Sequence, residues 1–108
     1  MKKLPYRART ATGDSFDIEF PLHGETRDPV RVGQILSTVL DAINKDIATA
    51  GETSNGDVLQ AVAMAMAIRA RMIHAPQEGL EALSAQLLRT ALAASAEAAR
   101  HTPQVGHA

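Results

Sequence analysis

The first part of the chain alternates between apolar and polar side chains. Residues 16–20 read Phe-Asp-Ile-Glu-Phe, which places three apolar groups on one face of an extended strand and two carboxylates on the other. Residues 6–10 alternate in the same way, and residues 12–14, Thr-Gly-Asp, form a typical turn sequence between the two runs. The pattern predicts an antiparallel β-hairpin over residues 4–21.

Two registers of this hairpin fit the charges. A loop at residues 12–14 places Arg9 opposite Asp17 and Arg7 opposite Glu19, whereas a loop at residues 11–13 places Arg7 opposite Asp17. Either register keeps both arginines on the acidic face, where a cross-strand pair contributes about 0.2–1 kcal/mol. An isolated hairpin is marginal in water, so its apolar face is expected to pack on helices.

Helical periodicity begins after Asp28-Pro29, a typical helix start with an N-cap acceptor and a proline in the first turn. It predicts a helix over about residues 29–50, and Gly51 is a suitable C-terminal stop. The apolar residues of this helix form one stripe about 140° wide. They are Val32, Ile35, Leu36, Val39, Leu40, Ile43 and Ile47.

A second helix is expected over residues 55–74, with Ser54 and Asp57 resembling a capping box, and a third over residues 77–101. The second helix is apolar over about 220° of its circumference, so it is expected to be the buried central helix. Its apolar residues form two groups, Val58, Leu59, Val62, Met66 and Ile73 in one, and Met64, Ile68 and Met72 in the other.

These elements predict an α+β fold in which the N-terminal hairpin packs on a three-helix antiparallel array. A chain of 108 residues is expected to form a single domain, residues 1–108. Residues 102–108 carry no apolar anchor and are expected to be disordered.

Composition adds that the core is small and poor in aromatic residues. Twenty residues are alanine, whereas the chain has two Phe, one Tyr and no Trp or Cys. A core of this kind contributes less free energy per residue, so the isolated protomer is expected to be only modestly stable. No apolar run is long enough for a membrane span, and no secretory signal is evident, so a cytoplasmic location without membrane association is expected.

The residues that usually carry chemistry show no specific pattern. His74 and Glu78 are four residues apart but separated by Pro76, and Glu97 and His101 are most simply a solvated pair at a helix end. There is no nucleophile elbow, Walker loop or zinc-ligand spacing. We expect no catalytic, cofactor or metal site, and the sequence favours a protein that is not an enzyme.

A basic N-terminus gives one functional alternative. Lys2, Lys3, Arg7 and Arg9 would let a β-ribbon lie against nucleic acid. Two of these four charges face acidic residues across the hairpin, and the net charge of the chain is −1. Nucleic-acid binding is therefore the second hypothesis and not the first.

The leading hypothesis is a non-catalytic interaction or scaffold protein that forms a homo-oligomer through its helices, a different protein partner being the alternative occupant. Met64, Ile68 and Met72 are the apolar group that a single protomer is least able to cover. Arg69 lies inside the apolar arc of the same helix, where it either pairs with an acid such as Glu81 or anchors an interface. Asp46 is likewise unexpected at its position on the first helix, because an acid is disfavoured near a helix C-terminus.

Overall fold

The computed structural model describes residues 2–103, which form an antiparallel sheet followed by three long helices. The strands are β1 (Lys3–Arg9), β2 (Ser15–Pro21) and β3 (Arg100–His101), in the sheet order β1-β2-β3. The helices are α1 (Pro29–Ala50), α2 (Asn55–Arg71) and α3 (Gln77–Glu97). The predicted α+β class, with its N-terminal hairpin, is confirmed.

The hairpin adopts the register with the earlier loop. Arg7 lies opposite Asp17, and the turn is closed by the Thr10 N–H, which donates to the Asp14 carbonyl at 2.8 Å. Gly13 has a φ of +94°, a backbone conformation that glycine adopts without steric cost. We expected Phe16, Ile18 and Phe20 of β2 to be buried, but they are only half-buried, because the helices cover this face of the sheet incompletely.

Helix α1 begins and ends as the sequence predicts. The Asp28 carboxylate accepts the Arg31 N–H at 3.1 Å, and Gly51, with φ +94°, donates its N–H to the Ile47 carbonyl at 2.8 Å. The first turns of α1 lie against the half-buried face of β1, where the Tyr6 hydroxyl hydrogen-bonds to the Ser37 hydroxyl at 3.0 Å. At the second helix, Ser54 is the N-cap residue, but its side chain accepts no capping hydrogen bond.

Helix α3 is shorter than predicted. It ends at Glu97 and not at residue 101, because Arg100 and His101 pair with β2 as the third strand. The Arg100 guanidinium lies 4.8 Å from the centre of the Phe16 ring and 3.5 Å from the Asp14 carboxylate, which favours the extended conformation. Helix α2 likewise ends at Arg71, three residues before its predicted end. The predicted disorder of residues 102–108 lies, from residue 104 on, outside the described residues.

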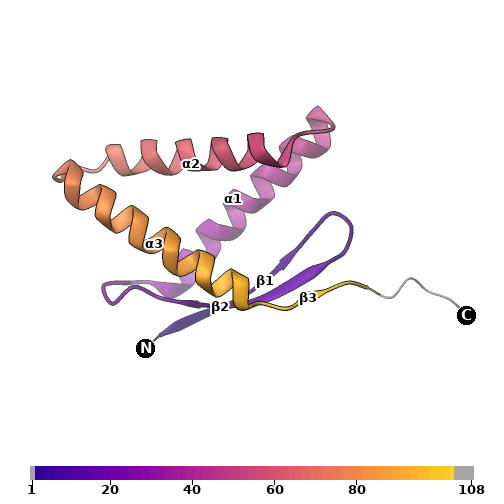
Figure 1. Cartoon of the computed structure of the whole chain (residues 1–108), viewed down its shortest axis with the longest axis horizontal. Coiled ribbons are helices and arrows are strands. Elements are labelled where there is room, and N and C mark those ends of the chain that lie inside the picture. The colour runs from indigo at the N-terminus through magenta and orange to yellow at the C-terminus, as the bar shows by residue number, and fades with distance from the viewer. Residues whose placement is uncertain (1, 104–108) are drawn as a thin grey trace, which may run out of the picture.

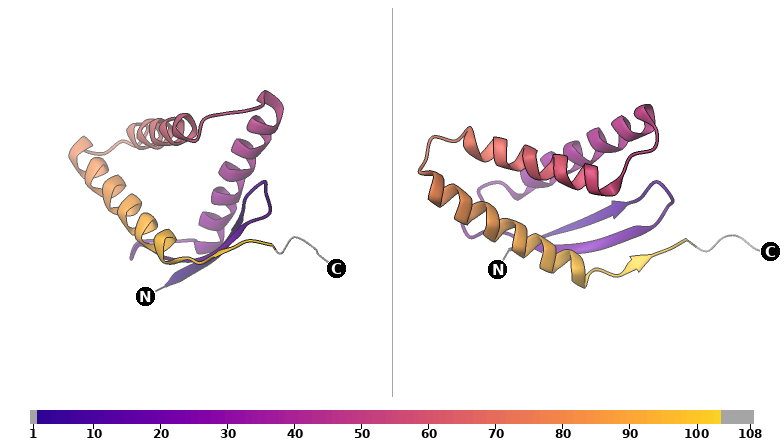
Figure 2. Two further views of the ribbon diagram at one scale, coloured as in Figure 1. Left: turned by 45° about the vertical axis from the view of Figure 1, so that its right-hand side comes forward. Right: turned by 45° about the horizontal axis from the view of Figure 1, so that its top comes forward.

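The three helices outline an open triangle with the sheet at its base, as Figure 1 and the left view of Figure 2 show. Helix α3 packs along β2 and touches α2 at one corner, whereas α1, within residues 2–103, packs closely on neither of the other helices. Helix α2 therefore closes the triangle far from the sheet. Its expected central, buried position is wrong, since most of its side chains are exposed.

The hairpin register can be read from amide exchange. The Thr10–Asp14 bond and the bond from the Leu22 N–H to the Lys2 carbonyl show that even-numbered residues of β1 bond to β2. We expect slow exchange at Leu4, Tyr6 and Ala8 and fast exchange at Lys3, Arg7 and Arg9. Nuclear magnetic resonance would measure this alternation, and the opposite alternation would show that the register is wrong.

Candidate protein interface

The helices present most of their apolar surface to solvent. In residues 2–103, the only side chain classed as buried is Leu80, which is 7% exposed. Fourteen large apolar residues are more than one-third exposed, and all of them lie between residues 30 and 92. They are Val30, Val32, Ile35, Val39, Leu59, Val62, Met64, Ile68, Met72, Ile73, Leu83, Leu87, Leu88 and Leu92.

Part of this surface forms an apolar groove between α1 and α2, which we call the α1–α2 groove. It has a volume of about 510 Å³ and lies where the second half of α1 faces the first half of α2. Its lining is largely aliphatic but includes two carboxylates, Asp46 from α1 and Asp57 from α2. The remaining lining residues are Val39, Ala42, Ile43, Ile47, Thr53, Val58, Ala61, Val62 and Ala65.

A second apolar hollow, the basal pocket, lies between the sheet and the helices α1 and α3. Its volume is about 560 Å³, and it is lined mainly by Leu4, Phe20, Leu22, Leu36, Leu83 and Leu87. The chain thus leaves apolar hollows at both ends of α1. Large exposed apolar patches commonly mark surfaces that another molecule covers.

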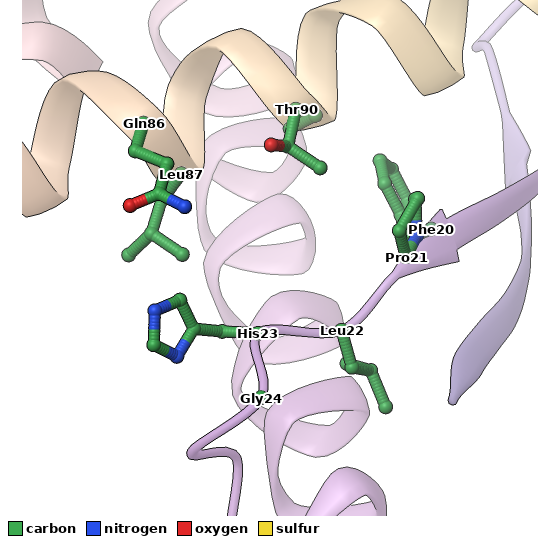
Figure 3. Close-up of a pocket in the computed structure, with 9 residues that line it drawn as sticks. Phe20, Pro21, Leu22, His23, Gly24, Gln86, Leu87 and Thr90 are labelled. Carbon is green, nitrogen blue, oxygen red and sulfur yellow. The ribbon is translucent and has the colours of Figure 1, made fainter. Parts of the chain in front are cut away.

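A smaller cleft of about 300 Å³ lies beside the basal pocket (Figure 3). In it the His23 ring lies below Gln86 and Leu87 of α3, with Thr90 on the same helix. The His23 Nδ1 atom accepts the Glu25 N–H at 3.1 Å. Among the residues that line this cleft, the imidazole is the only titratable side chain, so the cleft offers hydrogen bonds and a single acid–base group.

The interface residues predicted from sequence lie on the exposed helix α2 and, for Met72, at its C-cap. Met64, Ile68 and Met72 are 55%, 57% and 64% exposed. Arg69 is exposed as well and, within residues 2–103, forms no salt bridge, so the predicted pairing with Glu81 is not formed. The sequence analysis did not predict the α1–α2 groove or the position of Asp57 in its lining. The short connection at residues 51–54 could have indicated the groove, because it joins two helices that both carry an apolar stripe.

The basic residues of the nucleic-acid hypothesis lie at the N-terminus and on the solvent face of β1. Lys2, Lys3, Arg7 and Arg9 are all exposed. Arg7 is held by Asp17 through two hydrogen bonds, from Nε at 2.7 Å and from Nη2 at 3.0 Å. This pairing neutralises one of the four charges.

The same ion pair shifts both titrations. The hydrogen bond from Arg7 holds the pKa of the Asp17 carboxyl below its usual range, helped by the charges of Arg7, His101 and Arg9. The pKa of Arg7 is raised by the hydrogen bond and charge of Asp17. Both groups are well exposed, so solvent screens the pair and its contribution to stability is small.

Across residues 2–103, no three acidic, histidine or cysteine side chains gather closely enough to share a metal ion. None of the helices found there combines the length and the apolar content needed to cross a bilayer.

The Arg7–Asp17 pair predicts a specific pH dependence of stability. Folding lowers the pKa of the Asp17 carboxyl, so the ionised carboxylate stabilises the folded state. This stabilisation is fully present above the pKa of the unfolded chain, about 3.9, and is lost as the pH falls through the lower pKa of the folded state. We expect Asp17→Asn to lower the thermal midpoint slightly at pH 7, and the difference from wild type to shrink below about pH 4. Glu19→Gln, on the same face of β2, is the control, and a difference for Asp17→Asn that stays constant with pH would contradict the prediction.

Comparison of the chain with protein-family models, with curated proteins and with solved structures finds no match.

Proposed function

We propose that this protein is a non-catalytic interaction protein that works as a homo-oligomer held together by its helices. The observation that carries the proposal is the amount of surface left uncovered. The chain exposes 8835 Å². A compact monomer of the same mass would expose about 5,800 Å². The excess, about 3,000 Å² per chain by the same relation, includes the exposed apolar side chains of all three helices.

The shape of the chain supports the same conclusion. Its radius of gyration is 15.9 Å, whereas a compact domain of this length has about 13 Å. Obligate homodimers bury about 2,000–5,000 Å² in total. Two copies of this chain therefore carry uncovered surface of the amount that such an interface requires.

The edge of the sheet formed by β1, by contrast, is a poor assembly surface. The odd-numbered residues of β1 direct their backbone groups away from β2, and these residues are Lys3, Pro5, Arg7 and Arg9. Proline has no N–H to donate, and a row of cations opposes the approach of a second identical strand. Strand addition at β1 is therefore disfavoured, which favours the helices as the route to assembly.

Light scattering at micromolar concentration tests the proposal. We expect a mass of at least twice the 11.5 kDa of one chain. Ile68→Asp should lower that mass, because a carboxylate placed in an apolar interface loses its hydration. The residue is 57% exposed in the protomer, so the substitution is not expected to unfold it.

Gln60→Asp is the matched control, since it adds the same charge to an exposed position on the polar side of α2. It should leave the mass unchanged. A wild-type protein that has the mass of one chain even at high concentration would overturn the proposal.

A further inference from the structure

Helix α2 carries a positive charge on the face that lines the α1–α2 groove. Arg69 follows Ala65 by four residues and Val62 by seven, so it shares their side of the helix. Both of these residues line the groove, and Arg69 extends the same face toward the α2–α3 corner. Its side chain is exposed and forms no salt bridge within residues 2–103.

The groove carries the opposite charge. Asp46 and Asp57 are the two carboxylates among its aliphatic lining, and neither forms a salt bridge within the described part of the chain. The position of Asp57 in the first turn of α2 is favoured by the helix dipole. Asp46 has no such local reason, because it lies near the C-terminal end of α1.

We infer that these charges are the two halves of an intermolecular ion pair, in which α2 of a second copy packs antiparallel on α2 across a two-fold axis. Arg69 of each copy then lies against Asp57 and Asp46 of the other. This inference rests on the proposed homo-oligomerisation and specifies its geometry.

The register that this pairing requires also suits the rest of α2. Placing Arg69 opposite Asp57 of the second copy places Ala61 opposite Ala65, and small side chains at the crossing point allow two helices to approach closely. Twelve residues separate Asp57 from Arg69, which is about 18 Å along a helix. One ion pair therefore lies at each end of the interface, and Val58 and Ile68 contribute to the apolar centre between them.

The direction of packing follows from the charges at the ends of α2. Its first turn carries Asp57, and its last turn carries Arg69 and Arg71. Antiparallel packing brings each acidic end against a basic end, whereas parallel packing would bring like charges together. A two-fold axis also uses one surface twice, so the single set of charges on each chain satisfies both copies.

The pairs are expected to select the register more than to add affinity. Moving charges from water into an interface costs free energy that their attraction only partly returns. Leaving one of them buried without its partner costs far more, so other registers are disfavoured. The apolar area supplies the affinity in this arrangement.

A charge-reversal experiment with mixed chains tests the arrangement. Arg69→Asp alone sets the introduced carboxylate against Asp57 twice in a dimer, and Asp57→Arg alone sets two arginines together twice. We expect each single variant to raise the dimer dissociation constant about tenfold or more. An equimolar mixture of the two should restore dimers that contain one chain of each kind. In such a mixed dimer, each end of the interface sets one carboxylate against one arginine.

Native mass spectrometry distinguishes the mixed dimer, and Arg89→Asp, the same change of charge at an exposed position of α3, is the matched control. Unchanged dimers of the single variants, or a mixture that stays monomeric beside a dimeric wild type, would overturn the arrangement while the proposed oligomer stands. A monomeric wild type would overturn both.

A cross-link gives a second measurement that does not depend on altered charges. The chain has no cysteine, so Ala65→Cys introduces a single thiol on the groove-lining face, near the expected axis. A short bifunctional thiol reagent should link two such chains. Ala63→Cys, on the opposite side of α2, should not cross-link, and equal cross-linking of both variants would contradict the proposed face.

Discussion

The sheet is too small to cover the apolar stripes of three long helices. β1 and β2 have seven residues each and β3 has two, whereas the helices have 22, 17 and 21. Only the start of α1 and the second half of α3 reach the sheet. The remaining helical surface has nothing in the same chain to pack on, and the open triangle follows from this mismatch.

The exposed surface is nevertheless organised. Its apolar parts gather into the α1–α2 groove and the basal pocket, which lie toward the two ends of α1. The two charged residues that line the groove, Asp46 and Asp57, are acidic, and the C-terminal end of α2 is basic. An apolar surface with complementary charges at its two ends fits a two-fold assembly better than it fits a random collapse of hydrophobic side chains.

The exposed face and the β1 edge of the sheet are polar. Its solvent face holds an exposed ion pair, Arg7 with Asp17, and its free edge consists of proline and basic residues. Such an edge resists the addition of a further strand. The fold therefore restricts the ways in which a second molecule can approach, and the helices remain as the accessible apolar surface.

The local sequence determined the hairpin and the three helices. Alternation fixed the two faces of β2, and Asp28, Pro29 and Gly51 fixed the ends of α1, because strand alternation and helix caps act within a few residues. The exposed group Met64, Ile68 and Met72 was also predictable, since one protomer cannot surround a helix that is apolar over most of its circumference.

Tertiary structure alone decided the rest. Pairing of Arg100 and His101 with β2 depends on where α3 ends in space. The observed hairpin register sets one arginine opposite an acid where the alternative would set two, so the charge pattern did not decide between them. The place of α2 depended on whether the other helices could reach it. Periodicity shows which face of a helix is apolar, but it does not show which surface covers that face, because covering depends on contacts between residues far apart in the chain or in another copy of it.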